Sequence, residues 1–335
     1  MKWILKLFAA GLVAVGLASL MTAPAFAAPV NVRLAKQPGM GYLPLMVMEH
    51  EKLFEKHAKQ AGVEITTEWL KFTGGAAMNE ALLSGNLDIA SGGIPPLLTI
   101  WSKTKNNYKV KGIASISSHP QFLLTTNPKV KKLADFSAVD KIALPAVKIS
   151  NQAVMIQMAA IKQMGEAKAF AIDPYTVSMG HGDAMAAMLG GAIDAHFSQS
   201  PFQDIELRDP KVHIVLNSYD AVGGPYPIAV AYATDRFFKD HPKLLKAFVD
   251  ALKEAQGMIR SNINYAADVW IKMDVKKFTK DEALGILKNP KISWDAAPQN
   301  TLTFLKHMNK VGLVERTTKD WRDVYFPAIH DLHGS

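Results

Sequence analysis

The chain has 335 residues, of which 49% are hydrophobic, 20% charged and 9% aromatic. This balance excludes disordered and collagen-like chains, and the length predicts two domains. Because the sequence contains no cysteine, it also excludes disulfides, thiolate metal sites, iron–sulfur clusters, cysteine nucleophiles and a lipid-modified N-terminal cysteine.

The first 27 residues have the pattern of an export signal. Lys2 and Lys6 give a positive start, residues 7–21 form an uncharged apolar run, and residues 25–27 (Ala-Phe-Ala) form a small-x-small cleavage site. A membrane anchor is the alternative, but the run is shorter than the about 20 residues that a span needs. We therefore predict a periplasmic protein that is cleaved near Ala27 and carries no lipid anchor.

The charge of the mature chain is mildly basic. The signal segment holds two lysines and no acid, so 36 basic and 30 acidic residues remain, a formal charge of +6. The lysines are scattered, without an arginine-rich helix or interleaved aromatic residues, so we predict no nucleic-acid partner. The charge is compatible with a small anionic ligand.

Strands and helices alternate along the first part of the mature chain. The predicted strands are 30–35, 64–70 and 87–90, and the predicted helices are 42–57 and 76–83. Glycine-containing turns follow the strands, at 37–41, 72–75 and 91–96. Such alternation indicates parallel strand pairing and an α/β fold.

One segment of the sequence occurs twice. Residues 83–89 (LSGNLDI) match residues 189–195 (LGGAIDA) at a constant offset of 106, and the same offset pairs Gly74 with Gly180. Either a duplication or the general pattern of α/β units accounts for the match. In both cases the two regions are predicted to share a loop, a helix, a glycine stop and a strand that begins at an aspartate.

The second copy has its own strand at 141–144, a loop at 145–152 and a helix that runs to Met164. Strands at 110–117 and 121–126 are interrupted at 118–120, and a further alternating strand covers 227–234. These crossings predict two lobes joined by a two-strand hinge. Lobe one is predicted to hold residues 28–117 and 227–335, including a helix at 242–259, and lobe two residues 118–226.

The predicted loops favour an anion site that lacks arginine. In open parallel sheets, ligands collect beyond the C-terminal ends of the strands, where helix N-termini expose backbone N–H groups. The loops 72–75, 91–93, 150–151 and 180–182 are rich in small and hydroxyl residues, which let a ligand approach the backbone closely. Two lobes facing each other would direct these loops into one cleft.

No enzyme motif is present in the sequence. The dinucleotide fingerprint, the phosphate loop and the nucleophile elbow are missing, and His50 and His57 lack the spacing of a zinc-binding helix. We therefore predict that the protein is not an enzyme and needs no metal or cofactor. His119, His181 and Lys148 remain candidates for ligand contact, because their loops are expected to line the cleft.

The order and spacing of these pieces resemble one family. The loops 72–75 and 91–95, the strand 87–89 and the segment 191–195 are similar to those of the periplasmic substrate-binding proteins of ABC importers for nitrate, sulfonates and taurine. The resemblance implies a two-lobed type II periplasmic binding protein fold with mixed, mostly parallel sheets. It also implies a membrane permease and a cytoplasmic ATPase as partners. Residues 194–201 keep Asp, Ala and Pro of the family pattern but contain His196 and Gln199, which leaves the ligand open.

We predict a monomeric solute-binding protein for a small organic anion of the sulfonate or carboxylate type, with Lys148 as counter-charge. An amino-sulfonate is disfavoured because the predicted cleft loops hold few acids to pair with its ammonium group. The alternatives are a binder of nitrate, bicarbonate or a thiamine-pyrimidine precursor, an exported enzyme of the same fold, and a signalling receptor component. The predicted ligand-binding residues are Gln37, Met40, Gly41, Tyr42, Phe72, Thr73, Gly74, Gly75, Ser91, Gly92, Gly93, Ser118, His119, Lys148, Ser150, Asn151, His181, Phe197, Ser198 and Tyr226.

Overall fold

The structure is a computed structural model, and it describes residues 28–335 with the exception of residue 277. The predicted export signal falls on residues 1–27 and so lies outside the described residues. Within the described part of the chain, no helix combines the length and the apolar character that a membrane span requires.

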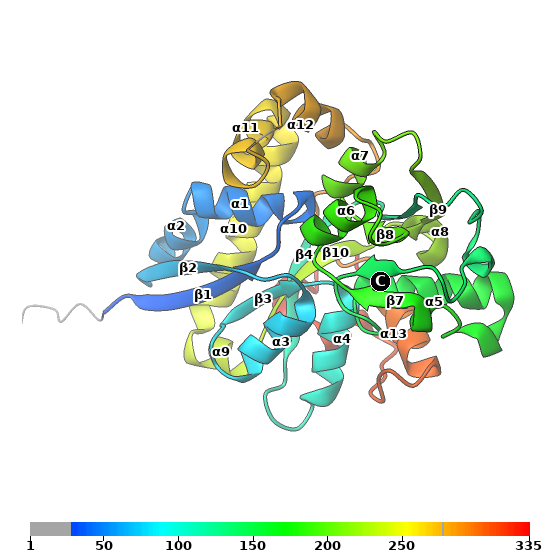
Figure 1. The fold of residues 1–335 in the computed structure, drawn as a ribbon. Coiled ribbons are helices and arrows are strands. Elements are labelled where there is room, and N and C mark those ends of the chain that lie inside the picture. Colours follow the sequence, from blue (N-terminus) through cyan, green and yellow to red (C-terminus); the bar gives the residue numbers. More distant parts are fainter. Residues whose placement is uncertain (1–27, 277) are drawn as a thin grey trace, which may run out of the picture.

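The strands form two five-stranded sheets (Figure 1). The first sheet has the order β2-β1-β3-β10-β4 and contains β1 (Val30–Lys36), β2 (Ile65–Lys71), β3 (Ile89–Gly92), β4 (Lys111–Ser118) and β10 (Pro227–Ala233). The second has the order β7-β6-β8-β5-β9 and contains β5 (Phe122–Thr125), β6 (Ile142–Leu144), β7 (Thr176–Ser178), β8 (Ala195–Ser198) and β9 (His213–Asn217). In each sheet one strand, β10 or β5, runs against the others. The predicted mixed, mostly parallel α/β fold is confirmed.

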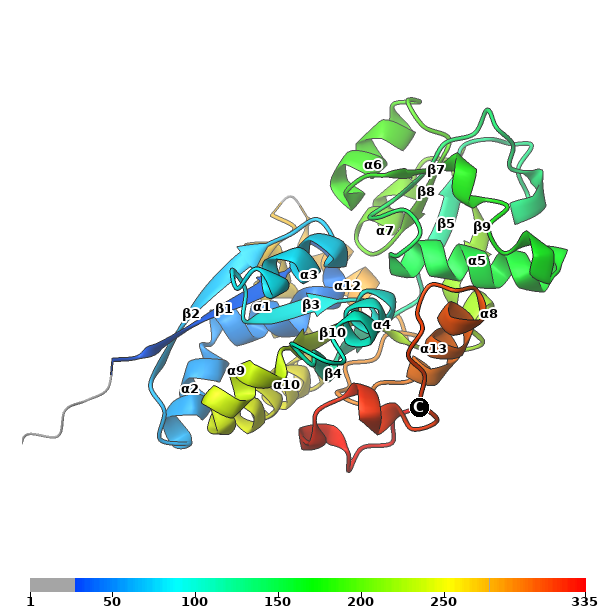
Figure 2. The same ribbon diagram turned by 90° about the horizontal axis from the view of Figure 1, so that it is seen from below.

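We call the first sheet with its helices lobe one and the second with its helices lobe two (Figure 2). The helices around the first sheet are α1 (Leu43–His50), α2 (Leu53–Gln60), α3 (Gly75–Leu83), α4 (Ile94–Lys103), α9 (Asp235–Asp240), α10 (Pro242–Ser261), α11 (Ile263–Met273) and α12 (Lys280–Leu287). Those around the second are α5 (Asn151–Met164), α6 (His181–Leu189), α7 (Phe202–Glu206) and α8 (Ser218–Val222). Helix α13 (Thr301–Lys310) contacts both α4 and α5. Short 3₁₀ turns cover Met40–Tyr42, Leu133–Asp135, Glu166–Lys168, Asp173–Tyr175, Trp321–Val324 and Pro327–Ile329.

The long helix α10 shows how sequence pattern produces the core of lobe one. Its apolar residues recur at helical spacing, so they lie on one face, and that face packs against α1 and α2. Phe248 on α10 meets Phe54 on α2 edge to face, with ring centroids 5.3 Å apart. The prediction of a single helix over 42–57 is wrong: Lys52 adopts a left-handed conformation (φ 51°), which ends α1 and lets α2 turn onto α10.

The repeated segment folds into equivalent elements. The bounds of α3 and α6 differ by 106 residues, and so do those of β3 and β8. In each copy the aspartate before the strand accepts a backbone hydrogen bond from a neighbouring strand or the residue before it. Arg33 N of β1 donates to Asp88 Oδ2, and Lys141 N, just before β6, donates to Asp194 Oδ2, both at 2.8 Å. The predicted loop–helix–strand unit is confirmed, and in each lobe its aspartate links the strand that follows it to the neighbouring strand.

The chain passes between the two sheets twice. Residues 119–121 connect β4 to β5, and residues 218–226 connect β9 to β10. All strands of the second sheet therefore lie between these two crossings in sequence. The order of each sheet places the C-terminal ends of β1, β3, β6 and β8 beside the space between the lobes, which positions the loops described next.

Candidate functional site

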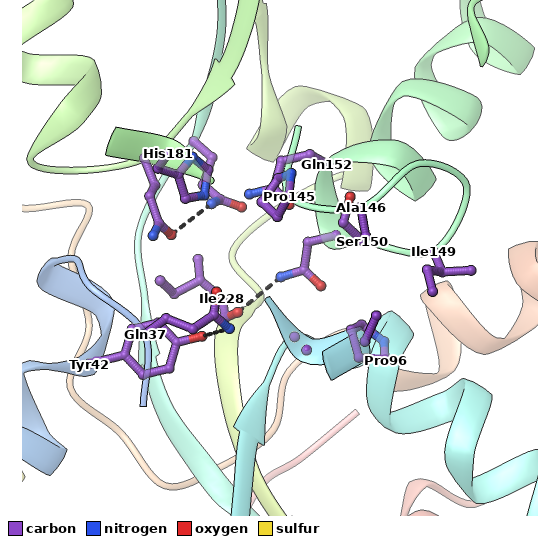
Figure 3. Close-up of a pocket in the computed structure, with 16 residues that line it drawn as sticks. Gln37, Tyr42, Pro96, Pro145, Ala146, Ile149, Ser150, Gln152, His181 and Ile228 are labelled. Atoms are coloured by element: carbon purple, nitrogen blue, oxygen red, sulfur yellow. Dashed lines mark hydrogen bonds between the residues drawn. The ribbon is translucent and has the colours of Figure 1, made fainter. Parts of the chain in front are cut away.

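A cavity with about 410 Å³ of empty space, partly open to solvent, lies between the lobes (Figure 3). Its lining residues come from loops and helix starts of both lobes, from the first crossing and from β10: Gln37, Tyr42, Gly75, Ala76, Gly93, Pro96, Gln121, Pro145, Ala146, Ile149, Ser150, Asn151, Gln152, His181, Gln199 and Ile228. This set contains no aspartate, glutamate, lysine or arginine.

The N-termini of four helices meet at this cavity. Lining residues Gly75, Asn151 and His181 are the first residues of α3, α5 and α6, and Gly93 is the N-cap of α4. The first N–H groups of a helix have no acceptor within the helix, and the helix dipole makes this end positive. In α4 only Ile94 offers such a group, because Pro95 and Pro96 follow it and have no N–H. The cavity can therefore hold an anion through backbone groups, without a cationic side chain.

Lobe one adds a phenol to these backbone donors. Gln37 Nε2 donates to Tyr42 Oη at 2.5 Å, so the hydroxyl proton of Tyr42 is available for a ligand. Burial raises the pKa of Tyr42 above its ordinary value, which keeps the phenol protonated. Tyr42 is thus a hydrogen-bond donor near neutral pH.

A series of hydrogen bonds runs along the cavity wall, from the second crossing to lobe one. Tyr226 Oη donates to Gln121 Oε1 at 2.9 Å, and Gln121 Nε2 donates to Gln199 Oε1 at 3.2 Å. Gln199 Nε2 then donates to the Pro38 carbonyl of lobe one at 3.3 Å. The second proton of each amide remains available, so this series fixes two glutamines as donors in the cavity wall.

Lobe two contributes a buried chain of titratable side chains. His181 Nδ1 lies 2.8 Å from His196 Nε2, and His196 Nδ1 lies 2.6 Å from Glu206 Oε1. His196 and Glu206 are fully buried, while His181 lines the cavity and stacks on Phe202 with ring centroids 5.7 Å apart. Burial, and secondly the neighbouring His196, lowers the pKa of His181 well below its ordinary value.

Hydrogen bonds join the two lobes around the cavity, so the structure is in a closed arrangement. Asn151 Nδ2 on α5 donates to the Ile228 carbonyl on β10 at 3.0 Å, and Met40 N donates to the Ser200 carbonyl at 3.0 Å. Asn151 also occupies the place that a side chain at Gly93 would need, since an added Cβ would lie 1.8 Å from Asn151 Oδ1. The close approach of the lobes therefore requires glycine at this position.

The structure brings seven of the predicted residues together around the cavity: Gln37, Tyr42, Gly75, Gly93, Ser150, Asn151 and His181. Thr73 lies in an adjoining hollow that Gln37 and His181 share. Gly74 faces Pro145 of lobe two, with an added Cβ 3.6 Å from its ring. Tyr226 stands behind the cavity and orients Gln121. Contact of these residues with a ligand stays a prediction.

The other predicted residues lie elsewhere. Met40, Phe197 and Ser198 are fully buried within their lobes, and Phe72 packs against the core of lobe one. Gly41, Ser91 and Gly92 support backbone packing, Ser118 pairs with Ser293, and His119 is buried in the first crossing without a hydrogen-bond partner among the described residues. Lys148 lies in a separate hollow with Phe170 and Asp173. Burial or position thus keeps these side chains out of the cavity lining.

Sequence reasoning missed the remaining lining residues, which include Gln121, Gln152, Gln199, Pro96, Pro145 and Ile228. Gln199 is a departure from the family pattern, and Gln121 is the last residue of the first crossing. Neither position has a spacing or composition signal of its own. Their roles depend on the distance between the two lobes, which no local pattern in the sequence contains.

Two lobes, two chain crossings and a cavity between helix N-termini define the class of periplasmic binding proteins. The sequence profile of the NMT1-like family matches residues 27–271, so the chain belongs to that family. Over 249 residues it is 28% identical to the taurine-binding periplasmic protein of Escherichia coli strain K12, covering 72% of this chain and 69% of the relative. The expected resemblance to binding proteins of nitrate, sulfonate and taurine importers is confirmed, and these relatives are binding proteins, not enzymes.

Solved structures show the same fold. The alkanesulfonate-binding protein SsuA of Xanthomonas axonopodis pv. citri, bound to MOPS, has a TM-score of 0.66 at 17% identity, covering 86% of this chain and 93% of that one. The nitrate-binding protein NrtA of Synechocystis PCC 6803 has a TM-score of 0.68 at 15% identity, covering 89% and 85%.

Proposed function

We propose that the protein captures a small organic anion of the sulfonate or carboxylate type between its lobes and delivers it to the permease of an ABC importer. The observation that carries this proposal is the cavity in which four helix N-termini meet without an acidic side chain in the lining. Relatives named for taurine, alkanesulfonate and nitrate binding support the same broad class of ligand.

The lining favours an organic body over nitrate or bicarbonate. Pro96, Ile149 and Ile228 present apolar surface beside the polar donors. A bare inorganic anion would leave this surface without a partner, whereas a short alkyl or aryl group would cover it. The anionic head would then face the helix N-termini.

The ligand we propose carries no ammonium group. An enclosed ammonium needs a carboxylate or several acceptors, and an unpaired buried charge costs several kcal/mol. The lining offers Asn151 Oδ1 as an acceptor without a hydrogen-bond partner among the described residues, but no carboxylate. Taurine and ethanesulfonate differ by this one group, so they form a matched pair of ligands.

Calorimetry on the mature chain, beginning at Ala28, tests the proposal. Ethanesulfonate is expected to bind more tightly than taurine and more tightly than nitrate. A folded protein that binds taurine better than ethanesulfonate contradicts the proposed ligand class. A protein that binds no sulfonate, carboxylate, nitrate or pyrimidine contradicts the transport function itself, as does catalytic turnover of a bound ligand.

The cellular setting follows from the same proposal. The chain is a monomer in the periplasm, cleaved near Ala27 and free of a lipid anchor, and it presents the closed complex to a permease that a cytoplasmic ATPase drives. Fractionation should find the mature chain in the periplasm, and deletion of its gene should abolish uptake of the ligand. Unchanged uptake would favour a role in signalling through a membrane receptor.

A further inference from the structure

The chain Glu206–His196–His181 runs from the interior of lobe two to the cavity wall. Its two contacts, 2.6 Å and 2.8 Å, are hydrogen-bond distances, and each such contact holds one proton between its two atoms. Glu206 and His196 are fully buried, and Glu206 Oε2 has no partner among the described residues. His181 Nε2, the last nitrogen of the chain, has no hydrogen-bond partner within the described residues and belongs to a side chain that lines the cavity.

Counting the protons on the three hydrogen-bonded side chains Glu206, His196 and His181 gives two states. With only the two bridging protons, the three side chains carry a net charge of −1, and His181 Nε2 faces the cavity as a bare acceptor. With a third proton the net charge is zero, and His181 Nε2 carries a hydrogen that it can donate. The net charge and the state of His181 Nε2 do not depend on which atom of each contact carries the bridging proton, because both contacts keep one proton in either state.

We propose, on the basis of the proposed anion-binding function, that Glu206–His196–His181 is a proton-coupled ligand contact that donates to the bound anion only in its neutral, three-proton state. An anion cannot accept from a bare nitrogen, and a net negative chain next to it is repulsive. Ligand binding therefore selects the neutral state and is linked to uptake of a proton whenever the empty protein has lost it. His181 is the contacting residue, and His196 and Glu206 are positioning residues.

The surroundings contain few competing groups. Asp183 lies on α6, Asp204 lies on α7, and Arg208 follows α7, where it pairs with Glu282 of lobe one at 2.9 Å. The strands β5 and β6, against which α7 and α6 pack, contribute no titratable side chain. Burial raises the pKa of Asp204, so this carboxyl is the group most able to imitate the chain's titration.

Glu206→Gln separates the proposal from a merely structural role. A glutamine can donate to His196 through its amide nitrogen or accept through its oxygen. The arrangement with a bare His181 Nε2 and the arrangement with a protonated one are then both neutral and hold the same number of protons. The variant is expected to bind the anion with an affinity that no longer depends on pH. Asp204→Asn is the matched control, a neighbouring carboxyl changed in the same way; it should keep the wild-type slope of affinity against pH, although its charge acts on Glu206 and its removal can move the midpoint.

The experiment measures the dissociation constant of ethanesulfonate from pH 5.5 to 9. Ethanesulfonate stays ionised throughout, so any pH dependence comes from the protein. Above the pKa of the chain we expect the affinity of the wild type to fall by about tenfold per pH unit. Calorimetry in Tris and in triethanolamine, whose ionisation enthalpies differ, should show uptake of close to one proton there. Sulfonate buffers are avoided because they belong to the ligand class.

A pH-independent wild-type affinity overturns the proposal, and so does a wild-type pH slope in Glu206→Gln. Nitrogen-15 shifts of the histidine rings in the empty wild-type protein keep the test decisive if that variant does not fold. They should show His181 Nε2 losing its proton between the acid limit of the folded state and pH 9, and a nitrogen that stays in one state over that whole interval contradicts the proposal. Absence of anion binding at every pH, with His181 titrating as described, contradicts the proposed function and leaves the proton chain intact.

Discussion

The two copies of the repeated unit have the same architecture but different cavity chemistry. Helices α3 and α6 begin at equivalent positions, yet lobe one has Gly75 where lobe two has His181. The same offset sets Ala90 against His196. Lobe one therefore offers bare backbone N–H groups, while lobe two offers an imidazole supported from behind by a second imidazole and a carboxylate.

This difference shows that architecture and chemistry are set by separate residues of the unit. Asp88 and Asp194, which the copies share, fasten β3 and β8 to their sheets. The residues that differ, at the first helical position and within the strand, decide what the cavity presents to a ligand. A substitution at a shared position should therefore change stability, and one at a differing position should change binding.

The largest effect is expected for a histidine outside both copies. His119, in the first crossing, has no partner among the described residues, and burial lowers its pKa to about 3. The unfolded chain binds a proton near pH 6.5 that the folded chain refuses, so this residue lowers stability as pH falls from 6.5 towards 3, by about 1.4 kcal/mol per pH unit. His119→Phe should remove about 3 kcal/mol of the stability loss between pH 7 and pH 4.5 in urea unfolding.

An exposed histidine supplies the control for this titration. His333→Gln should leave the dependence of stability on pH as in the wild type, because His333 is exposed. If His119→Phe kept the wild-type loss of stability at acid pH, the crossing would not be the acid-sensitive point of the fold.

The next effect concerns closure of the lobes at Gly93, which corresponds to Gln199 in lobe two. An alanine at Gly93 needs no change of backbone but forces Asn151 off the Ile228 carbonyl. We expect Gly93→Ala to weaken anion binding by about tenfold to a hundredfold, with little change in thermal stability. Calorimetry measures the affinity, and Gly285→Ala, at a glycine with no atom within 4 Å of the added Cβ, is the control.

A double-mutant cycle identifies the contact behind that loss. In an Asn151→Ala background, Gly93→Ala should have almost no further effect, because the side chain with which it collides is gone. Additive losses from the two substitutions would instead place the obstruction elsewhere.

The shared aspartates should affect stability and not binding. Asp88 accepts a backbone bond and two bonds from the Arg33 side chain, whereas the carboxylate of Asp194 accepts the Lys141 backbone bond. We expect Asp88→Ala to cost about 2 kcal/mol and Asp194→Ala about 1 kcal/mol in urea unfolding. A loss of affinity in either folded variant would contradict their purely structural role.

The smallest effect is expected at Lys148. The sequence predicts it as the counter-charge of the ligand, but its side chain lies with Asp173 in a hollow apart from the cavity lining. Lys148→Met should therefore change the affinity for ethanesulfonate by less than about twofold at moderate salt. A loss of tenfold or more would restore the original assignment.

The sequence was informative where a feature is local. The strand and helix periodicities, the repeat and the crossings near Ser118 and Tyr226 appear in the structure at or near the predicted residues. The cavity was predicted less well, because contacts such as Gln121 with Gln199 depend on how the lobes meet. Phe197 and Met40 looked suitable as ligand contacts, but only the packing of the lobes shows that they are buried in the core.

A crystal structure with 2-bromoethanesulfonate tests the central claim most directly, because the bromine marks the ligand by its anomalous signal. We predict the sulfonate oxygens between the N-termini of α3 and α4 in lobe one and those of α5 and α6 in lobe two, with one oxygen within hydrogen-bond distance of His181 Nε2. A sulfonate bound beside Lys148, or in the cavity but away from His181, would contradict the account.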